Sequence, residues 1–560
     1  MFLTPADRVR DYEARGLWAG ESVDAMLRRA VAAGGDAETL IDPVNRRDLD
    51  GKKPERLSWR AVDARVDALA AALLDHGLRK DDIVVSQLPN TVDAVLLFLA
   101  CARLGLILSP VVMQYRTHEL AHVVERTAPR AFVTVPRFGG FDHAALAGTL
   151  GVPVLLFDDL HGGDPAAVAA YTAANPTVGA EVLTICWTSG TEARPKGVPR
   201  DHNHWTLNGD LVAQATGMLP GDTLLNPFPL VNIGSIGGLV MPWLALPAKK
   251  LVLHHPFDLG IFLRQIAGEG VSYTIAPPAV LTALLKQPAL LASVDISSMR
   301  AIGSGSAPLS PWLIGGWKEQ YGIDIANIFG SNEGASLVSS AVDVPDTADR
   351  ARFFPRFGAE GQDWGGIIGR SLRTRLVGDD GSVVTEPGIA GEMRISGATT
   401  FGGYWRSPEL TATAFDADGW FRTGDLFEIA GDGELSRFYR FVGRSKEIIV
   451  RGGVNISPAE LDDLLAGMPQ VREAATVGIP DDDLGERIAV AVVPHDGATP
   501  TLDDVKAWLR GQGVAIFKSP ERLVCVDRLP RNAMNKVVRA DLREMVLAAL
   551  SDRSSVPRSA

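Results

Sequence analysis

The chain has 560 residues, of which 46% are hydrophobic and 22% charged, and its formal net charge at pH 7 is −12. This composition is typical of a folded globular enzyme and excludes fibrous and disordered classes. The negative charge argues against non-specific binding to nucleic acids or to anionic membranes, so an anionic ligand must be held by a local pocket.

Cysteine usage and the N-terminus indicate a cytoplasmic protein. The three cysteines, Cys101, Cys186 and Cys525, lie far apart in the chain, which favours free thiols over disulfides or a metal site. The N-terminus lacks the apolar core of a secretory signal. The most apolar stretch, 94–113, contains Arg103 and Pro110, so we expect a buried helix and strand and no stable membrane insertion. The sequence carries no mark of the oligomeric state.

Helices and strands are predicted to alternate through the first 160 residues. Residues 58–77 have apolar side chains at a helical spacing, with Ser58 as a cap and Gly77 as a stop. A strand (83–86), a buried helix (91–104) and another strand (106–112) follow, and the pattern recurs at 117–127, 131–135 and 152–157. Such alternation predicts βαβ crossovers and a largely parallel sheet. Residues 161–180 show no firm period, and we expect a surface connection there.

A loop suited to a triphosphate follows an apolar strand at 182–187. Hydroxyl groups, glycines and a lysine can donate to phosphate oxygens and offset their charge. The loop differs from a Walker P-loop, because its lysine is followed by Gly-Val-Pro. The residues concerned are Thr188, Ser189, Gly190, Thr191 and Lys196.

Residues 224–246 contain no charged side chain. Most of them are expected to form a core strand and helix, but Gly234, Gly237 and Gly238 beside Asn232 would leave room for a ligand against the backbone.

Three further segments carry turn or ligand-binding signals. Residues 301–310 and 327–333 are glycine-rich turns after predicted strands, and each is a weak signal alone. The run 402–426 ends on Asp425 and Leu426, and a carboxylate such as that of Asp425 can accept two hydrogen bonds from a diol. Beyond it, helices at 459–466, 502–510 and 537–550 and strands near 474–477, 488–493 and 522–526 predict a compact α+β module of about a hundred residues.

Taken in this order, the segments from about Ser58 to Arg539 resemble the adenylate-forming superfamily, which includes acyl-CoA synthetases, luciferases and peptide-synthetase adenylation domains. The resemblance implies an α/β fold with a large N-terminal domain built of βαβ sheets and a small mobile α+β C-terminal domain. It places the domains at 1–444 and 445–560, with the hinge at Lys446.

The resemblance also assigns roles to individual residues. Lys536, Thr191 and Glu333 would be catalytic, and Glu333 would also bind Mg²⁺. ATP would contact Thr188, Ser189, Gly190, Thr191, Lys196, Gly305, Ser306, Ala307, Asn327, Phe329, Gly330, Asn332, Asp425 and Arg444. The acid would lie against Asn232, Gly234, Ser235, Gly238 and Gly303, and Gly452 and Gly453 would line the CoA tunnel. Arg451, Arg472 and Lys518 are available for the CoA 3′-phosphate.

Several positions depart from the family pattern. Glu192 and Ala193 replace Thr and Gly in the phosphate loop, and Asn232 replaces a His. Phe329 replaces a Tyr, Asn332 a Thr and Asn535 a Gly, although Asn tolerates a left-handed backbone better than most residues.

The implied reaction joins a carboxylic acid to CoA through an acyl-adenylate, using ATP and Mg²⁺. No acidic residue lies in 224–246 to pair with an ammonium group, which argues against an amino acid, and the apolar segment favours an aromatic, alicyclic or medium-length acid. The alternatives are an enzyme that passes its acyl-adenylate to a separate carrier protein, and a catalytically weak nucleotide-binding regulatory protein.

Overall fold

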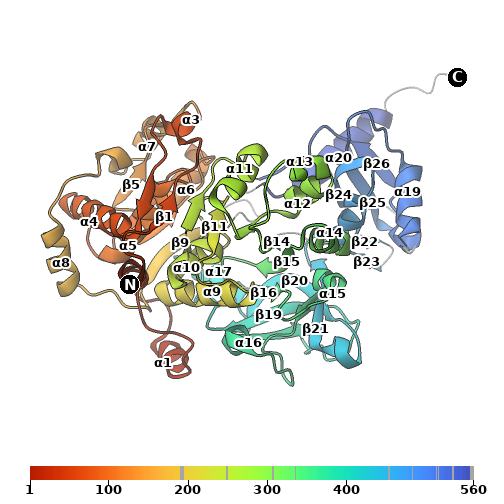
Figure 1. Cartoon of the computed structure of the whole chain (residues 1–560). Coiled ribbons are helices and arrows are strands. Elements are labelled where there is room, and N and C mark those ends of the chain that lie inside the picture. The colour runs from red at the N-terminus through yellow and green to blue at the C-terminus, as the bar shows by residue number, and fades with distance from the viewer. Residues whose placement is uncertain are drawn as a thin grey trace.

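The computed structural model describes residues 1–188, 195–246, 250–305, 308–334, 336–451, 454–481, 484–512, 514, 516–532 and 535–554, with the backbone alone at 454, 455 and 552–554. Over these residues the fold is α/β, with a large N-terminal part and a small C-terminal part at one end of the molecule (Figure 1).

A six-stranded sheet forms in the first part of the chain, in the order β10-β9-β4-β3-β5-β8. Its neighbours run parallel except for the antiparallel pair β9 and β10. Ser58 caps α4 by accepting a hydrogen bond from the Ala61 amide at 3.2 Å, as predicted. The strands are β3 (Ile83–Gln87), β4 (Ile107–Pro110), β5 (Ala131–Thr134), β8 (Val154–Leu156), β9 (Val182–Thr188) and β10 (Lys196–Asp201), with helices α4 (Trp59–Asp75), α5 (Val92–Leu104), α6 (Thr117–Thr127) and α7 (His143–Gly148) between them.

An eight-stranded sheet lies beside the first, in the order β16-β15-β14-β13-β11-β12-β1-β2. Its inner strands run parallel, and β2 and β16 close the two edges antiparallel. The strands are β1 (Glu38–Ile41), β2 (Arg56–Ser58), β11 (Thr223–Asn226), β12 (Lys250–Leu253), β13 (Tyr273–Ile275), β14 (Ala301–Gly305), β15 (Asp324–Gly330) and β16 (Ser336–Ser339). Its helices are α2 (Val23–Gly34), α3 (Arg46–Asp50), α9 (His202–Ala215), the π-helix η2 (Ile236–Val240), α10 (Met241–Ala245), α11 (Leu259–Glu269), α12 (Pro278–Leu285), α13 (Pro288–Ala292) and α14 (Pro311–Tyr321).

The segment 161–180 lies at the surface, as predicted, but it contains a helix that the prediction missed, α8 (Pro165–Ala174). Asp164 caps it by accepting a hydrogen bond from the Ala166 amide at 2.9 Å, and Pro165 occupies its first turn. Only Val168 of this alanine-rich helix is buried, so the sequence has no apolar stripe to reveal it.

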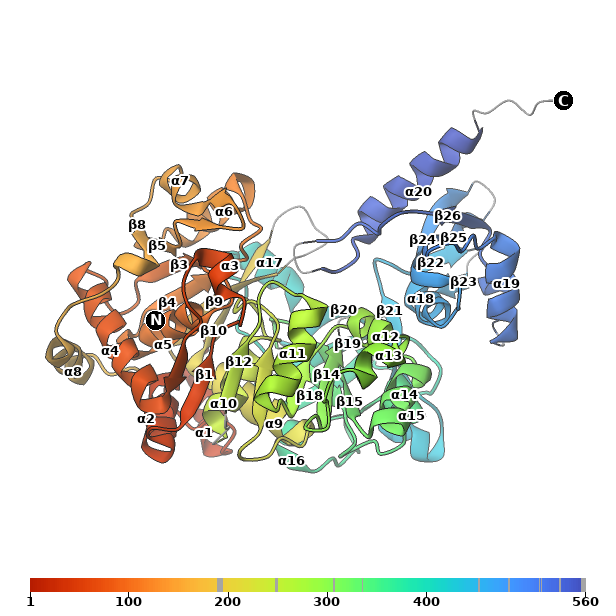
Figure 2. The same cartoon turned by 45° about the horizontal axis from the view of Figure 1, so that its top comes forward.

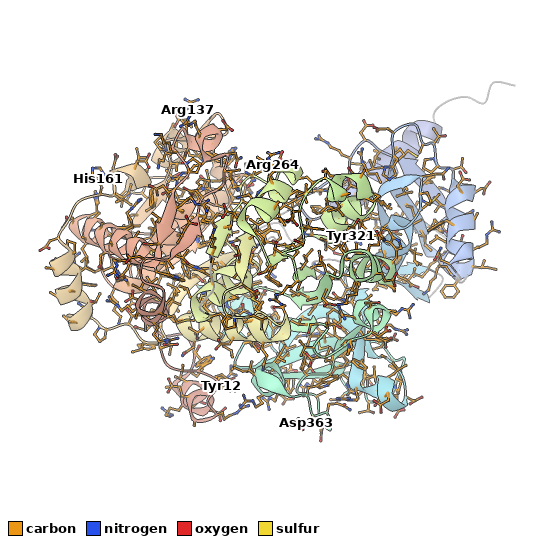
Figure 3. The ribbon with its side chains drawn as sticks, viewed as in Figure 1. Tyr12, Arg137, His161, Arg264, Tyr321 and Asp363 are labelled. Atoms are coloured by element: carbon orange, nitrogen blue, oxygen red, sulfur yellow. The ribbon has the colours of Figure 1, made fainter. Side chains whose placement is uncertain are left out.

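A third sheet is antiparallel throughout, in the order β17-β21-β20-β19-β18. It adds to the predicted βαβ sheets a layer whose consecutive strands pair without crossover helices. Its elements are α15 (Thr347–Arg352), β17 (Phe353–Pro355), α16 (Gly366–Ser371), β18 (Leu372–Val377), β19 (Gly391–Gly397), α17 (Pro408–Ala414), β20 (Phe421–Ile429) and β21 (Phe438–Arg444). The N-terminal helix α1 (Ala6–Ala14), which carries Tyr12, lies beside this layer (Figure 3), and Arg15 binds the Arg370 carbonyl at 3.0 Å.

The C-terminal part is an α+β unit, as predicted. Its sheet has the order β23-β22-β25-β24, and β26 pairs parallel with β25. Figure 2 shows this unit and its long helix α20 standing at the end of the larger part. The elements are β22 (Ile449–Arg451), β23 (Val454–Ile456), α18 (Pro458–Ala466), β24 (Val471–Asp481), β25 (Gly485–Pro494), α19 (Leu502–Gly511), β26 (Arg522–Cys525) and α20 (Arg539–Ser554). No helix in the described ranges combines the length and apolar character needed to cross a bilayer.

Candidate functional site

The predicted phosphate loop connects β9 to β10 at the carboxyl end of a parallel strand, where α/β sheets bind ligands. The Lys196 amide donates to the Thr188 hydroxyl at 3.4 Å, so the two strands close the base of the loop. The predicted loop residues Ser189, Gly190 and Thr191, and the departures Glu192 and Ala193, lie outside the described residues.

Tyr404 contacts both Glu333 and Lys196, the lysine at the end of this loop. The Tyr404 hydroxyl donates to Glu333 Oε1 at 3.0 Å, and the Lys196 ammonium lies 5.3 Å from the centre of the Tyr404 ring. Tyr404 therefore joins the phosphate-loop lysine to the carboxylate predicted to bind magnesium. Sequence reasoning gave Tyr404 no role, although the residue stands in the glycine-rich run 402–426.

The buried side chain of Arg200 binds the backbone next to Glu333. Arg200 is 1% exposed and donates to the Asn332 carbonyl at 2.8 Å. Burial lowers the pKa of Arg200 to about 10, against the opposing charges of Asp201 and Glu333. This arginine, which sequence reasoning also missed, fixes the backbone beside Glu333.

Phe329, predicted to stack on adenine, lies in an aromatic cluster. Phe329 lies 5.2 Å from Phe427 and 6.4 Å from both Phe354 and Phe441, measured between ring centres. Asn327 donates its amide to the carbonyls of Arg350 and Ala351, at 3.3 and 3.2 Å. These two bonds occupy the Asn327 Nδ2 group, and a contact of Asn327 with adenine stays a prediction.

Two glycines near Phe329, Gly305 and Gly330, were predicted to contact ATP. Gly330 is exposed at the end of β15. A Cβ at position 305 would lie 2.0 Å from the Ile328 carbonyl oxygen, so only glycine fits there. Ser306 and Ala307, which follow, lie outside the described residues.

The predicted ribose pair forms across neighbouring strands. Asp425 on β20 pairs in register with Arg444 on β21, and Arg444 Nε lies 3.3 Å from Asp425 Oδ1. Burial raises the pKa of Asp425 to about 6, although the Arg444 charge lowers it. A carboxylate held in this way is a strong acceptor for hydroxyl donors.

Lys536 from the C-terminal part reaches the same site. Desolvation and the charge of Arg444 lower the pKa of Lys536, while Asp425 and Glu333 raise it, so all four side chains lie within electrostatic range. Water still reaches Lys536, which is exposed. Four of the residues that the sequence predicted therefore lie near enough to influence one another's charge, and two of them, Asp425 and Arg444, are in direct contact.

The loop before Lys536 confirms the expectation for Asn535, whose φ is +62° in the left-handed region. Arg531 donates to the Asn535 carbonyl at 2.7 Å, and the Lys536 amide donates to Asn532 Oδ1 at 3.0 Å. These bonds fix the backbone on which Lys536 projects.

The predicted acid-binding segment precedes and enters η2. Asn232 Oδ1 accepts from the Ser235 amide at 3.0 Å, and Asn332 Oδ1 accepts from the Ile233 amide at 2.9 Å. The Asn332 side chain therefore fixes this segment to the loop of Glu333, which gives that departure from the family pattern a structural role.

Ser235 is fully buried, and its hydroxyl bonds with Asn226 at 2.9 Å and with the Phe228 carbonyl at 3.1 Å. These bonds fix the backbone of the segment to β11 and to Phe228. Contact between Ser235 and the acid stays a prediction. A Cβ at Gly238 would lie 2.5 Å from Ile275, and one at Gly303 would lie 2.5 Å from the Tyr273 hydroxyl, while Gly234 lies beside Asn232. Contact of these glycines with the acid stays a prediction.

The predicted hinge, Lys446, lies exposed in the turn between β21 and β22. Of the basic residues considered for CoA, Arg451 pairs with Glu521 and Lys518 with Glu460, each at 2.7 Å. Arg472 reaches the Asp527 carbonyl at 3.5 Å. Gly452 and Gly453, the predicted tunnel residues, lie outside the described residues.

Glu333 fits a magnesium ion that is held mainly by nucleotide oxygens. Within the described ranges, no group of three or more His, Cys, Asp or Glu side chains is arranged to hold a metal ion. Mg²⁺ usually takes only one or two carboxylates together with phosphate oxygens and water. A single carboxylate, 8% exposed beside the phosphate loop, meets that need.

The fold and the site define a two-part, nucleotide-binding α/β enzyme. The family model for AMP-binding enzymes matches residues 27–405, and the model for the AMP-binding enzyme C-terminal domain matches residues 460–536. The chain therefore belongs to the AMP-binding enzyme family.

Curated relatives and a solved structure agree with this assignment. The chain is 31% identical to an indoleacetate–CoA ligase of Aromatoleum aromaticum, over 88% of this chain and 94% of the relative. It is 30% identical to a 2-hydroxy-7-methoxy-5-methyl-1-naphthoate–CoA ligase of Streptomyces carzinostaticus, over 96% of each. ATP-bound MatB of Rhodopseudomonas palustris superposes with a TM-score of 0.75 at 28% identity, over 94% of this chain and 99% of that one. The chain is an AMP-forming acid–thiol ligase of the acyl-CoA synthetase type, and ATP is its nucleotide.

Proposed function

We propose that the protein joins an aromatic carboxylic acid to CoA in two half-reactions. In the first, a carboxylate oxygen attacks the α-phosphorus of ATP, and pyrophosphate leaves. In the second, the CoA sulfur attacks the acyl carbon of the adenylate, and AMP leaves.

The observation that carries this proposal is that Lys536, from the C-terminal part, lies within electrostatic range of the Asp425–Arg444 pair and of Glu333. Asp425 and Arg444 hold the ribose, and the ammonium of Lys536 offsets charge that develops between the carboxylate and the α-phosphate. Mg²⁺ bound at Glu333 supplies further neutralisation of the phosphates. Positioning and charge neutralisation are sufficient for this chemistry without a covalent enzyme intermediate.

The acid would bind between η2 and β14, where the side chains beside the glycines are apolar except for the Tyr273 hydroxyl near Gly303. Gly238 packs against Ile275, and Gly303 packs against Ile275 and Ile328. No charged side chain occurs from 224 to 246. Two glycine-backed walls of this kind suit a flat ring, and the curated relatives named above for aromatic acids support the same class.

Lys536 and an incoming thiol need the same space, so the second half-reaction requires the C-terminal part to move. We propose domains at 1–444 and 445–560 that rotate about Lys446, and the Gly452–Gly453 segment as the wall of the CoA tunnel. Rotation of this kind concentrates the dihedral change in a few residues.

The test is AMP and pyrophosphate release from Mg·ATP with a panel of aryl, alicyclic and fatty acids, each with and without CoA. Release with aryl acids that multiplies when CoA is added is the expected result. A single slow turnover that ignores CoA would instead assign the acyl group to a carrier protein, and silence with every acid would contradict adenylation itself.

A further inference from the structure

The amide oxygen of Asn208 is buried and makes no hydrogen bond to the residues that the structure describes. Asn208 lies on α9 with 3% of its surface exposed. An unpaired buried amide is costly, so native proteins rarely keep one unless water or a ligand completes it.

The amide lies directly against the acid-binding segment. A Cβ at position 237 would stand 1.8 Å from Asn208 Oδ1 and 3.3 Å from the Ile233 side chain. Only glycine at 237 therefore lets the Asn208 amide approach η2. The next residue, Gly238, faces Ile275 at a distance of 2.5 Å from its would-be Cβ.

Side chains pack closely around Gly303 on the opposite side. A Cβ at Gly303 would lie 2.5 Å from the Tyr273 hydroxyl and 3.2 Å from Ile275. Ile275 therefore lies against both Gly238 and Gly303.

Tyr273 is a second polar group at this end. Its hydroxyl is buried and makes no hydrogen bond of normal geometry. Burial raises the pKa of Tyr273, and the nearby Thr216 hydroxyl lowers it in part. Because Thr216 gives its own proton to the Val212 carbonyl at 2.7 Å, it can still accept from Tyr273.

We propose that Asn208 is a specificity-determining residue that recognises a hydroxyl or amino substituent on the ring of the acid. The inference rests on the proposed function, because it places the ring between η2 and β14. A primary amide both donates and accepts, so it can satisfy both hydrogen-bonding capacities of such a substituent. A site built for a hydrogen bond rejects the analogue that lacks it, because its own polar group is then left unpaired.

The test compares kcat/KM for AMP release with matched acids: benzoate and phenylacetate against their ring-hydroxylated and ring-aminated isomers. Wild-type enzyme is expected to prefer at least one substituted isomer by tenfold or more over its parent. Asn208→Leu, similar in size but apolar, is expected to remove that preference and to keep or improve the rate with the parent acid.

Two controls separate recognition from folding. Asp210→Asn changes an exposed residue of the same helix and should leave the preference intact. Asn208→Ser retains a smaller polar group and should retain part of the preference, and AMP binding measured by calorimetry should be unchanged in all variants.

An equal fall with every acid in both Asn208 variants would overturn the inference, because it would show a structural role. A wild-type enzyme that forms AMP with aryl acids but ignores their substituents would overturn it while leaving the proposed function in place. No AMP with any acid would remove the proposed function and this inference together.

Discussion

Lys536 is the residue whose loss should separate the two half-reactions. Its ammonium lies within range of Asp425 and Glu333 in this arrangement of the chain. Lys536→Ala is expected to slow adenylation about a hundredfold or more, because a charge aimed at the transition state is removed. Thioester formation from pre-made adenylate should fall much less. Single-turnover assays of each half-reaction measure the two effects, and Lys506→Ala on α19 is the control.

If the rates of both half-reactions fall equally in Lys536→Ala, the lysine serves both steps, and the rotation proposed above is not needed. If neither changes, the charge is supplied from elsewhere. An intermediate result, with a tenfold difference or more between the two steps, supports separate arrangements for the two reactions.

Asp425, which is predicted to bind the ribose, lowers the free energy of unfolding at neutral pH because its carboxylate is buried. Burial raises its folded-state pKa to about 6, above the value of an unfolded chain. The protonated form is therefore favoured in the native state, and stability is lost as the pH rises from about 4 through about 6. At pH 7 the ionised, buried carboxylate costs on the order of 3 kcal/mol in the free energy of unfolding.

Asp425→Asn removes this titration. We expect a higher thermal unfolding midpoint than wild type at pH 7.5, a gap that closes toward pH 4, and at least a tenfold loss of AMP affinity. Thermal unfolding across this pH range and calorimetry with AMP measure the two effects. Identical midpoints at pH 7.5 would show that Arg444 already compensates the buried charge.

At the level of elements, Arg103 holds three helices together. This residue of α5 has a fully buried side chain and binds Asp24 of α2 at 2.8 Å and Asp63 and Asp67 of α4 at 2.6 Å each. Arg103→Met leaves the carboxylates without their cation. We expect a loss of about 2–4 kcal/mol, toward the low end for broken buried pairs because water reaches part of Asp63 and Asp67.

Urea denaturation measures the loss, and Arg60→Met is the matched control. Arg60 lies on the same α4 helix and pairs with Asp36, but their side chains are 71% and 80% exposed. Its removal should leave the urea midpoint unchanged. An equally small effect for Arg103 would mean that the helices are held by apolar packing alone.

The sequence predicted elements wherever local patterns are strong. Ser58 and the apolar spacing after it located α4, and the buried run at 91–104 became α5. The helix α8 was not predicted, because it buries only one side chain and so has no apolar stripe. Long-range contacts were not predicted either. Nothing near Tyr404 or Arg200 in the sequence shows that these side chains contact Glu333 and the backbone of Asn332.

The candidate site shows the same division. The motifs located Asp425, Arg444, Glu333 and Lys536, since each stands in a run with a recognisable order. They could not show that Asn332 accepts from the Ile233 amide. Nor could they show that Asn208 Oδ1 makes no hydrogen bond among the described residues, because both facts depend on how α9, η2 and the end of β15 pack.

For the whole molecule, one lysine links the two parts of the chain. Lys286 follows α12 in the N-terminal part, and its ammonium donates to the carbonyls of Ala466 at 2.7 Å and Val471 at 3.3 Å in the C-terminal part. Desolvation lowers the pKa of Lys286. Ala466 ends α18, and a cation at a helix C-terminus is favourable. This contact stabilises the arrangement in which Lys536 faces Asp425.

Lys286→Ala should therefore bias the enzyme away from adenylation. We expect pyrophosphate release in a single turnover to slow about three- to tenfold, which corresponds to one or two hydrogen bonds to a charged group. Thiolysis of pre-made adenylate should be unchanged or faster, because the C-terminal part leaves this arrangement more readily. Lys318→Ala is the control, since Lys318 pairs with Asp324 inside the N-terminal part at 2.8 Å. A fall in thiolysis equal to that in adenylation would show that Lys286 supports the fold of the enzyme and not the choice between its two arrangements.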